Sequence, residues 1–264
     1  MIPARKSWGQ HFLTRGETAL RIVEAARVDP SDTVLEVGPG EAALTRPLSE
    51  RAGRLLAIEI DPLRAAALEE EFAGNPGVRI LRGDVLDRTF PEWLAEAGWS
   101  GPAVFVANLP YNAATPILQA AIEHPEAISR SVLTVQKEVA ERICARPGDS
   151  GYGFLSVRVA AFARGRILFD LAPGAFRPRP KVTSSVVELV PRSPALDPAA
   201  RDRALSLASL GFRSRRKTLA NALASEGGRG RWDDALEAIG KSRTVRAEEL
   251  SLEDYLELEL AATA

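Results

Sequence analysis

The first half of the chain alternates short apolar runs with longer amphipathic stretches. The apolar runs have the length and β-branched content of buried strands, at residues 33–37, 54–58, 78–81, 103–107 and 131–135. Helical spacing of apolar positions accompanies them, over residues 17–27, 42–50, 61–72 and 136–143. With two further strands expected at 166–170 and 182–190, the pattern predicts an α/β fold, Rossmann-like, with a mostly parallel seven-stranded sheet.

The pattern changes after Pro191. Pro191, Pro194 and Pro198 lie within eight positions and indicate a linker. Beyond it only helical spacing appears, at residues 199–210, 216–225, 232–239 and 251–260. We therefore expect an α/β domain over residues 1–191 and a small all-helical domain over residues 192–264.

Composition excludes several classes of protein. With 45% hydrophobic and 26% charged residues, the chain is ordinary for a globular protein. No apolar run approaches the roughly 20 residues that cross a bilayer, and the basic N-terminus lacks the apolar core of a signal peptide, so we expect a cytoplasmic protein without membrane contact. Cys144 is the single cysteine, and His11 and His124 are far apart, so neither a disulfide framework nor a metal site is expected.

Basic residues gather in three clusters although the net charge is only −1. The clusters are Arg5 with Lys6, Arg177 with Arg179 and Lys181, and Arg213 with Arg215, Arg216 and Lys217. Any single cluster fits a solvated surface equally well. Three clusters beside motifs with candidate chemistry favour a polyanionic partner, and we expect these residues to bind RNA.

A glycine-rich turn follows the first strand and opens a helix. Gly38 and Gly40 allow a ligand to approach the backbone closely. Glu59 ends the next strand, 19 residues after Gly40, where a carboxylate can bind the two hydroxyls of a ribose. Sites for NAD and for S-adenosylmethionine share this pattern, and a tight turn without any ligand fits the glycines as well.

Two further strand ends favour S-adenosylmethionine. Asp84 follows the third strand, where its carboxylate can accept a hydrogen bond from the adenine amino group, and Asn108 ends the fourth. Because the carboxyl ends of parallel strands meet at one crevice, these side chains should surround one nucleoside and a reacting methyl group. Nothing obvious in the sequence serves hydride transfer.

Asn108-Leu109-Pro110-Tyr111 resembles the Asn-Pro-Pro-Tyr motif of amino-group methyltransferases. The exocyclic nitrogen of adenine is a poor nucleophile because its lone pair is delocalised into the ring. The Asn108 amide oxygen and the Leu109 carbonyl can accept its two hydrogens and localise that lone pair. Pro110 stiffens the turn, and Tyr111 offers a ring for stacking, worth ~1–3 kcal/mol. Positioning can supply roughly 7–11 kcal/mol of the barrier.

Signatures in the same order over residues 5–220 resemble the rRNA adenine dimethylase family, in its KsgA/RsmA type that acts on 16S rRNA. They are Arg5 to Leu13, Glu36 to Thr45, Ile58 to Asp61, Asn108 to Asn112, Gln136 to Glu138, Tyr152 to Ser156, Phe176 to Val182 and Phe212 to Leu219. This resemblance implies a class I methyltransferase domain followed by a helical domain that contacts RNA or the ribosome.

The resemblance also implies an activity and a set of contacts. It implies S-adenosylmethionine as methyl donor and dimethylation of two adjacent adenosines near the 3′ end of 16S rRNA, with a role in small-subunit biogenesis. We expect the protein to be a monomer. The cofactor contacts that carry over are Gln10, His11, Leu13, Gly38, Gly40, Glu59, Ile60, Asp84, Val85 and Asn108. Phe176 matches an aromatic residue that is expected to clamp the target base together with Tyr111.

One departure from the family pattern and two alternative functions stay open. His11 stands where the family usually has Asn, which puts its cofactor contact in question, although an imidazole can donate or accept. The alternatives are dimethylation of 23S rRNA and a non-catalytic ribosome-assembly or transcription factor on the same fold. The run Phe212 to Lys217 favours the small-subunit enzyme, and the intact Asn108 argues against lost catalysis.

Overall fold

The computed structural model describes residues 9–214 and 216–263, which form two compact units. The first, here called the sheet unit, runs to residue 140 and resumes over residues 165–191. The second, the helical unit, combines residues 141–164 with residues from 192 onward. The border at 191 lies where the proline-rich linker was expected, but residues 141–164 group with the helical unit, because their apolar side chains pack into its core.

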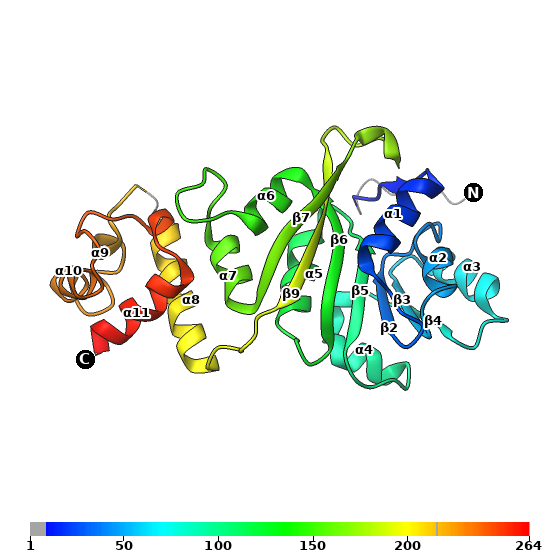
Figure 1. The fold of residues 1–264 in the computed structure, drawn as a ribbon, viewed down its shortest axis with the longest axis horizontal. Coiled ribbons are helices and arrows are strands. Elements are labelled where there is room, and N and C mark those ends of the chain that lie inside the picture. The colour runs from blue at the N-terminus through cyan, green and yellow to red at the C-terminus, as the bar shows by residue number, and fades with distance from the viewer. Residues whose placement is uncertain (1–8, 215, 264) are drawn as a thin grey trace. The chain divides into compact units, whose positions relative to one another are not determined.

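Seven of the described strands form the main sheet of the sheet unit, in the order β4-β3-β2-β5-β6-β9-β7 (Figure 1). They are β2 (Thr33–Val37), β3 (Arg54–Glu59), β4 (Val78–Arg82), β5 (Ala103–Asn108), β6 (Ile128–Gln136), β7 (Ala163–Leu171) and β9 (Ser184–Pro191). The pairings from β4 through β6 are parallel, and β9 is antiparallel to β6. The predicted mostly parallel α/β sheet is confirmed.

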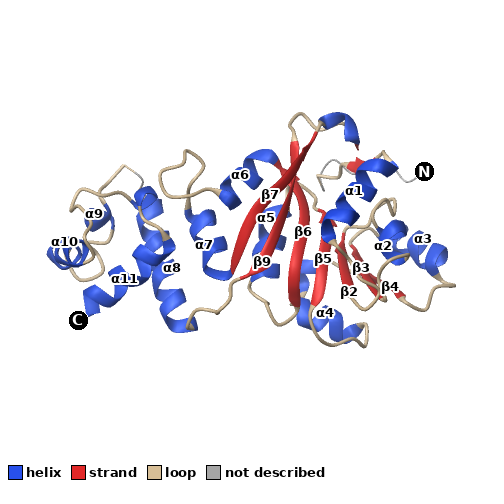
Figure 2. Cartoon of the chain, viewed as in Figure 1, coloured by secondary structure: helices blue, strands red, loops and turns tan. Residues whose placement is uncertain are grey.

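Strand β5 shows why the sheet carries helices on both faces (Figure 2). Val104 and Val106 belong to the core cluster that includes Ile22 of α1 (Gly16–Ala26). Phe105 points to the opposite face, where its ring lies 5.3 Å from that of Phe90 in α4 (Phe90–Glu96). Successive side chains of a strand point to opposite faces of the sheet. Because both faces are buried here, the residues on each face are apolar, which explains the continuous apolar run in the sequence.

Local signals set the bounds of the other helices in the first 144 residues. These helices are α2 (Thr45–Ser49), α3 (Pro62–Phe72), α5 (Ala114–Ile122) and α6 (Lys137–Cys144). The Asp61 side chain accepts a hydrogen bond from the Leu63 N–H and caps α3, as the sequence indicated. Helix α2 is shorter than the expected 42–50 because Ala42 has a φ of 61°, which no right-handed helix can contain.

A second, two-stranded sheet fixes the beginning of the described chain. Strand β1 (Phe12–Leu13) pairs antiparallel with β8 (Phe176–Arg177), which follows the short turn η3 (Pro173–Ala175). Another short turn, η2 (Val85–Asp87), follows β4. Residues that are more than 160 positions apart in the sequence are thereby joined, which brings the N-terminal residues to the edge of the main sheet where the strand ends lie.

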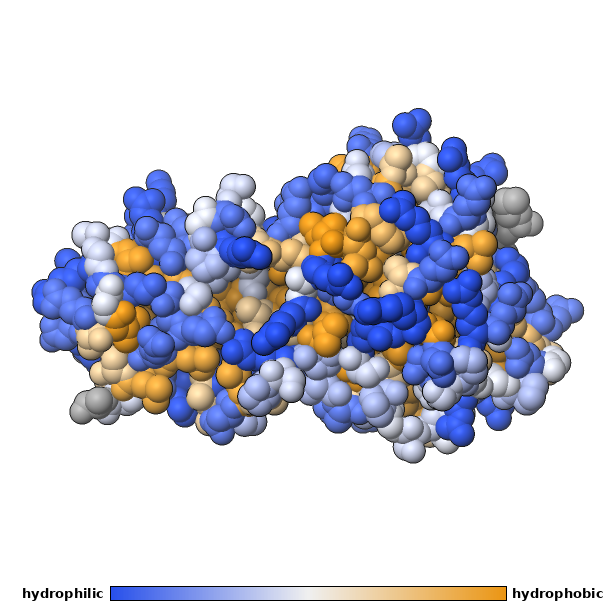
Figure 3. Space-filling model, in the orientation of Figure 1, coloured by the Kyte–Doolittle hydropathy of each residue, from blue (hydrophilic) through white to orange (hydrophobic). Residues whose placement is uncertain are grey.

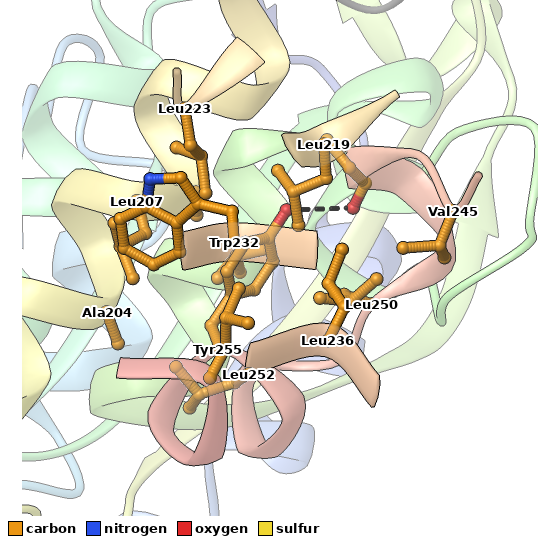
Figure 4. Packing of buried hydrophobic residues seen from close by; sticks show 14 of the residues in the cluster. Ala204, Leu207, Leu219, Leu223, Trp232, Leu236, Val245, Leu250, Leu252 and Tyr255 are labelled. Carbon is orange, nitrogen blue, oxygen red and sulfur yellow. Dashed lines mark hydrogen bonds between the residues drawn. The ribbon is translucent and has the colours of Figure 1, made fainter. Parts of the chain in front are cut away.

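The helical unit has its own core. Its described helices are α7 (Phe154–Phe162), α8 (Pro198–Arg213), α9 (Leu219–Ala222), α10 (Arg229–Ala238) and α11 (Leu252–Thr263), with the short turn η4 (Ala247–Glu249). Trp232, Leu236 and Tyr255 pack together at the centre of this core (Figure 4). Burial of such large apolar side chains, each worth about 1.5–3 kcal/mol, is the main stabilising contribution.

The visible surface is mostly polar, as the ordinary globular composition indicated (Figure 3). Figure 3 shows mostly hydrophilic residues on the visible face, with smaller groups of hydrophobic ones over the sheet and over the helices of the helical unit. None of the helices in the described part of the chain has the length and apolar character that a membrane crossing requires. Among residues 9–214 and 216–263, no three His, Cys, Asp or Glu side chains are grouped as metal ligands would be.

Candidate active site

The carboxyl ends of β2, β3, β4 and β5 open onto one cavity with a volume of about 310 Å³. This volume lies in the range of roughly 300–1,000 Å³ that is typical of small-molecule sites. The predicted residues that line it are Gln10, His11, Gly38, Glu59, Ile60, Asp84, Val85, Asn108, Leu109 and Pro110. The structure therefore brings most of the predicted cofactor residues to one place.

Glu59 joins the glycine-rich turn to the start of α3. Its two carboxylate oxygens accept hydrogen bonds from the Gly40 N–H, at 3.0 Å, and from the Asp61 N–H, at 2.9 Å. Burial raises the pKa of Glu59, and the two backbone hydrogen bonds act in the opposite direction. Glu59 is only 1% exposed, so these backbone hydrogen bonds, rather than solvent, hold its carboxylate at the cavity wall.

The two glycines have different surroundings. Both have left-handed backbones, with φ of 69° at Gly38 and 60° at Gly40. A Cβ on Gly38 would meet nothing within 4 Å, so this residue leaves the cavity open to a ligand. A Cβ on Gly40 would lie 2.6 Å from the Phe12 ring, so Gly40 sits beneath the N-terminal residues and does not line the main cavity.

Apolar side chains form the wall beside Glu59 and Asp84. Ile60 is 42% exposed and Leu86 is 43% exposed, although both are large and apolar. Exposed apolar groups beside a cavity suit a flat aromatic ligand, which would cover them. One oxygen of Asp84 accepts a hydrogen bond from the Leu86 N–H at 3.0 Å, and this contact holds the carboxylate at the edge of the cavity.

Asn108 ends β5 with its two amide atoms in different situations. Its Nδ2 donates a hydrogen bond to the main-chain oxygen of His11 at 2.8 Å. Its Oδ1 is buried and accepts no hydrogen bond from any described residue. The next residue, Leu109, donates its N–H to the Thr134 oxygen at 3.2 Å, which ties the loop to β6. The cavity therefore holds a fixed acceptor that has no partner within the described chain.

Tyr111 is anchored at its hydroxyl and at its ring. The hydroxyl is 2.5 Å from the Ser184 Oγ, and burial raises the pKa of Tyr111, so the phenol stays protonated. Its ring centroid lies 4.9 Å from that of His11, with the planes tilted by 32°. The half-buried ring is thus held at both ends beside the cavity.

Besides Gly40 and Tyr111, two further predicted residues do not line the main cavity. Phe176 is 4% exposed, belongs to β8 and packs in the core of the sheet unit, so the structure does not bring it to the cavity wall. Its expected place in a base clamp stays a prediction. Leu13 lines a smaller pocket that also includes Gly38 and Asn108.

The basic residues divide between the two units. Arg177, Arg179 and Lys181 are exposed on the sheet unit. In the helical unit, the exposed basic residues at the end of α8 and in the following turn are Arg213, Arg216 and Lys217. Arg5, Lys6 and Arg215 lie outside the described residues. Residues that contact RNA must be exposed, and these residues meet that requirement. Their role in RNA binding stays a prediction.

Sequence reasoning missed several residues of the cavity wall. These are Phe12, Val37, Ile58, Gly83, Leu86, Asn112, Ala113 and Ile117. Asn112 and Ala113 directly follow Tyr111, and Leu86 follows two predicted residues, so proximity to the motifs was the available signal. Ile117 lies in α5, which has no motif of its own.

Comparison with known proteins places the chain in a family. The family model described as "Ribosomal RNA adenine dimethylase" matches residues 1–263. A protein of Xanthomonas axonopodis pv. citri named "Ribosomal RNA small subunit methyltransferase A" is 41% identical, over 97% of this chain and 95% of its own. Proteins of the same name from Methylococcus capsulatus, with 40% identity, and Geobacter sulfurreducens, with 38%, cover 96% and 97% of this chain and 96% and 94% of their own.

Solved structures support the same placement. The 23S rRNA methyltransferase ErmE matches with a TM-score of 0.74 and 30% identity, over 96% of this chain and 100% of its own. A dimethyladenosine transferase from Plasmodium falciparum matches with a TM-score of 0.80 and 27% identity, over 95% of this chain and 96% of its own. The sheet and its helices have the Rossmann-like class I methyltransferase fold, and the chain belongs to the ribosomal RNA adenine dimethylase family.

Proposed function

We propose that this protein dimethylates the N6 amines of two adjacent adenosines near the 3′ end of 16S rRNA, with S-adenosylmethionine as methyl donor. Relatives that are named for the small subunit are 38–41% identical to the chain, whereas the 23S rRNA methyltransferase ErmE is 30% identical. This difference supports the small subunit as substrate and a role in its biogenesis. We expect the protein to act in the cytoplasm as a monomer.

The observation that carries the proposal is the unpartnered Oδ1 of Asn108. A buried acceptor without a hydrogen bond costs about 1–3 kcal/mol. A substrate amine that enters the cavity removes this cost by donating one of its hydrogens to Asn108. Binding of a ligand that offers an N–H group to this oxygen is therefore favoured.

The cavity fits S-adenosylmethionine. Glu59 is placed for the ribose hydroxyls and Asp84 for the adenine amino group, while Ile60, Val85 and Leu86 offer apolar contact to the adenine ring. Gly38 leaves room for the backbone to approach the ligand. When bound, the cofactor supplies a methyl group that is activated by a positively charged sulfur.

The residues of the catalytic loop prepare the amine. Asn108 Oδ1 and the Leu109 carbonyl accept its two hydrogens, which favours a tetrahedral nitrogen with an available lone pair. Tyr111 stacks on the extruded base, and the contact of its hydroxyl with Ser184 fixes the ring in place. No strong general base is required, because a methylated amine that carries a positive charge is acidic and loses its proton to water.

Mass spectrometry of rRNA fragments tests the proposal. Small subunits that lack the modification are incubated with protein and S-adenosylmethionine, and large subunits serve as the competing substrate. We expect two dimethyladenosines in one 16S fragment and none in 23S rRNA. Modification of 23S rRNA alone would overturn the choice of substrate, and no modification of either would overturn the activity.

The variant Asn108→Ala tests the carrying observation. We expect calorimetry to show retained binding of S-adenosylmethionine, while single-turnover methylation is lost. A rate near that of the wild type would contradict the role of Oδ1. Introducing the same variant into a deletion strain separates catalysis from a non-catalytic assembly role, since only the latter would be fully restored.

We further propose that the basic clusters bind the rRNA. They comprise Arg5, Lys6, Arg177, Arg179, Lys181, Arg213, Arg215, Arg216 and Lys217. Their support is the exposure of the described members and the need of a protein that binds RNA to neutralise phosphates. On this proposal the helical unit is a substrate-binding element rather than a catalytic one.

A further inference from the structure

Residues 9–14, here called the N-terminal strap, cross both loops of the active site. The Phe12 ring covers Gly40 in the glycine-rich turn, where any Cβ would lie 2.6 Å away. Gly9 lies against Asn112 in the catalytic loop, where a Cβ would come within 2.8 Å of the Asn112 Oδ1. The strap therefore touches the cofactor side and the substrate side of the cavity within four residues of each other.

The strap is held by pairing with residues from the far end of the sheet unit. Leu13 is in register with Phe176 in the two-stranded sheet. The Thr14 N–H and hydroxyl both donate to the Ala175 oxygen, at 3.0 and 3.2 Å. These contacts fix the strap at its end, so that the residues before them keep a defined position over the cavity.

His11 makes three separate contacts from the middle of the strap. Its main-chain oxygen accepts the hydrogen bond from Asn108 Nδ2 at 2.8 Å. Its ring Nδ1 lies 2.6 Å from the Pro178 oxygen. Its ring lies beside that of Tyr111, with 4.9 Å between centroids. One residue thus contacts the amine acceptor, the loop after β8 and the stacking ring.

The hydrogen bond to Pro178 determines which nitrogen of the imidazole carries the proton. A carbonyl oxygen only accepts, so Nδ1 carries the proton and donates. The ring is therefore fixed at Nδ1 and cannot rotate without losing this bond. Because the ring is fixed, it restrains the neighbouring Tyr111 ring from one side, while Ser184 restrains the Tyr111 hydroxyl.

We propose that the His11 side chain is a positioning residue that holds the Tyr111 ring in the orientation needed for the target base. This inference rests on the proposed function, because it concerns the same base site. The main-chain contact with Asn108 is available to any residue at position 11, whereas the ring contact requires an aromatic side chain. The Asn that the family usually has at this position has no ring to place against Tyr111.

Direct contact of His11 with the cofactor is the competing role, since His11 also lines the main cavity. The two roles predict different losses. A cofactor contact affects the affinity for S-adenosylmethionine, whether or not Tyr111 is present. A contact that orients Tyr111 affects methylation of the RNA and has no effect once Tyr111 has been removed.

The test combines three substitutions at His11 with a double-mutant cycle. His11→Ala and His11→Asn remove the ring, and His11→Phe keeps a ring but removes the donor to Pro178. Single-turnover methylation of unmethylated small subunits is measured for each variant, together with the dissociation constant of S-adenosylmethionine by calorimetry. Thermal unfolding confirms that each variant is folded.

We expect the Ala and Asn variants to lose roughly two- to tenfold in the methylation rate, as the loss of an aromatic pair implies. We expect His11→Phe to stay closer to the wild type, and cofactor affinity to be unchanged in all three. His11→Ala should cause no further loss when it is added to Tyr111→Ala. Wild-type methylation in the same assay establishes the proposed function independently of these variants.

Three results would overturn the inference while the proposed function stands. One is an Ala variant that methylates at the wild-type rate. The second is weaker cofactor binding by the Ala and Asn variants, which assigns His11 to the cofactor. The third is a full additional loss when His11→Ala is combined with Tyr111→Ala, because independent effects cannot come from orienting the Tyr111 ring.

Discussion

The Gly40 N–H donates a hydrogen bond of 3.0 Å to one carboxylate oxygen of Glu59, 19 residues further along the chain. The other oxygen of Glu59 accepts from Asp61, where α3 begins. A single buried carboxylate therefore holds the glycine-rich turn and the start of a helix on the same side of the cavity. Any ligand that uses both elements depends on this one side chain.

We predict that Glu59→Gln weakens binding of S-adenosylmethionine. An amide of the same shape can accept at only one of its two terminal atoms, so one backbone N–H loses its partner. Hydrogen bonds to charged groups are worth about 1.5–3 kcal/mol, so the dissociation constant should rise roughly 10- to 150-fold by calorimetry. Glu69→Gln, which alters an exposed residue of α3, is the control. Equal affinities for the two variants would contradict the role of Glu59.

The buried carboxyl of Glu36 should make stability depend on pH. Burial raises its pKa from the ordinary value of 4.5 to about 8, and the nearby Glu59 acts in the same direction. Between these values the folded protein holds a proton that the unfolded chain has released, so stability falls as pH rises through this interval. Glu36→Gln lacks this titration.

We therefore expect the difference in unfolding temperature, Glu36→Gln minus wild type, to become more positive between pH 5 and pH 8.5. Thermal unfolding at several pH values measures it. A difference that stays constant over this interval would show that Glu36 titrates normally in the folded protein.

Gly38→Ala and Gly40→Ala form a matched pair. Both residues have left-handed backbones, where an L side chain costs about 1–2 kcal/mol. Only Gly40 has the Phe12 ring above it, so Gly40→Ala must also displace the N-terminal strap. We expect denaturant unfolding to show the larger loss for Gly40→Ala. An equal loss of unfolding free energy in the two variants would mean that displacing the strap does not destabilise the protein.

The exposed pair Arg216 and Lys217 should contribute to the salt dependence of rRNA binding. Each phosphate contact that is lost reduces the slope of log K against log salt by about 0.7–0.9. We expect the double change to Gln to lower the slope and the affinity for small subunits. Arg243→Gln removes a cation that is paired with Glu237 at 2.6 Å, and it is the control in the same unit. Unchanged slopes for both proteins would exclude these residues from the contact.

Sequence patterns predicted the strands better than the helices. Strands such as β5 are buried on both faces, so their composition alone marks them. Helix α7 was not predicted, because residues Phe154–Phe162 are apolar on nearly every side and show no helical period. Helix α4 was also not predicted, although the capping box of Thr89 and Glu92 was a usable signal in the sequence. The expected helix over 216–225 is restricted to Leu219–Ala222.

The site was predictable where it depends on strand ends and not where it depends on tertiary contact. Gly38, Glu59, Asp84 and Asn108 lie at the ends of strands or just after them, and parallel strands end at the same edge. The contact between Asn108 and His11 joins residues 97 positions apart, and no local pattern indicates it. The burial of Phe176 in the core illustrates the same limit, because the sequence does not distinguish an aromatic side chain that faces a cavity from one that faces the core.

The helical unit is built from two separate lengths of chain. Tyr152 and Val157, from the first length, share a core with Leu207 and Tyr255 from the second, and the Tyr152 hydroxyl donates to the Leu250 oxygen at 2.8 Å. A truncation after residue 191 would leave the first length with an uncovered apolar surface, and such a fragment should aggregate. Chimeras that exchange this unit between relatives must therefore carry residues 141–164 as well as the C-terminal segment.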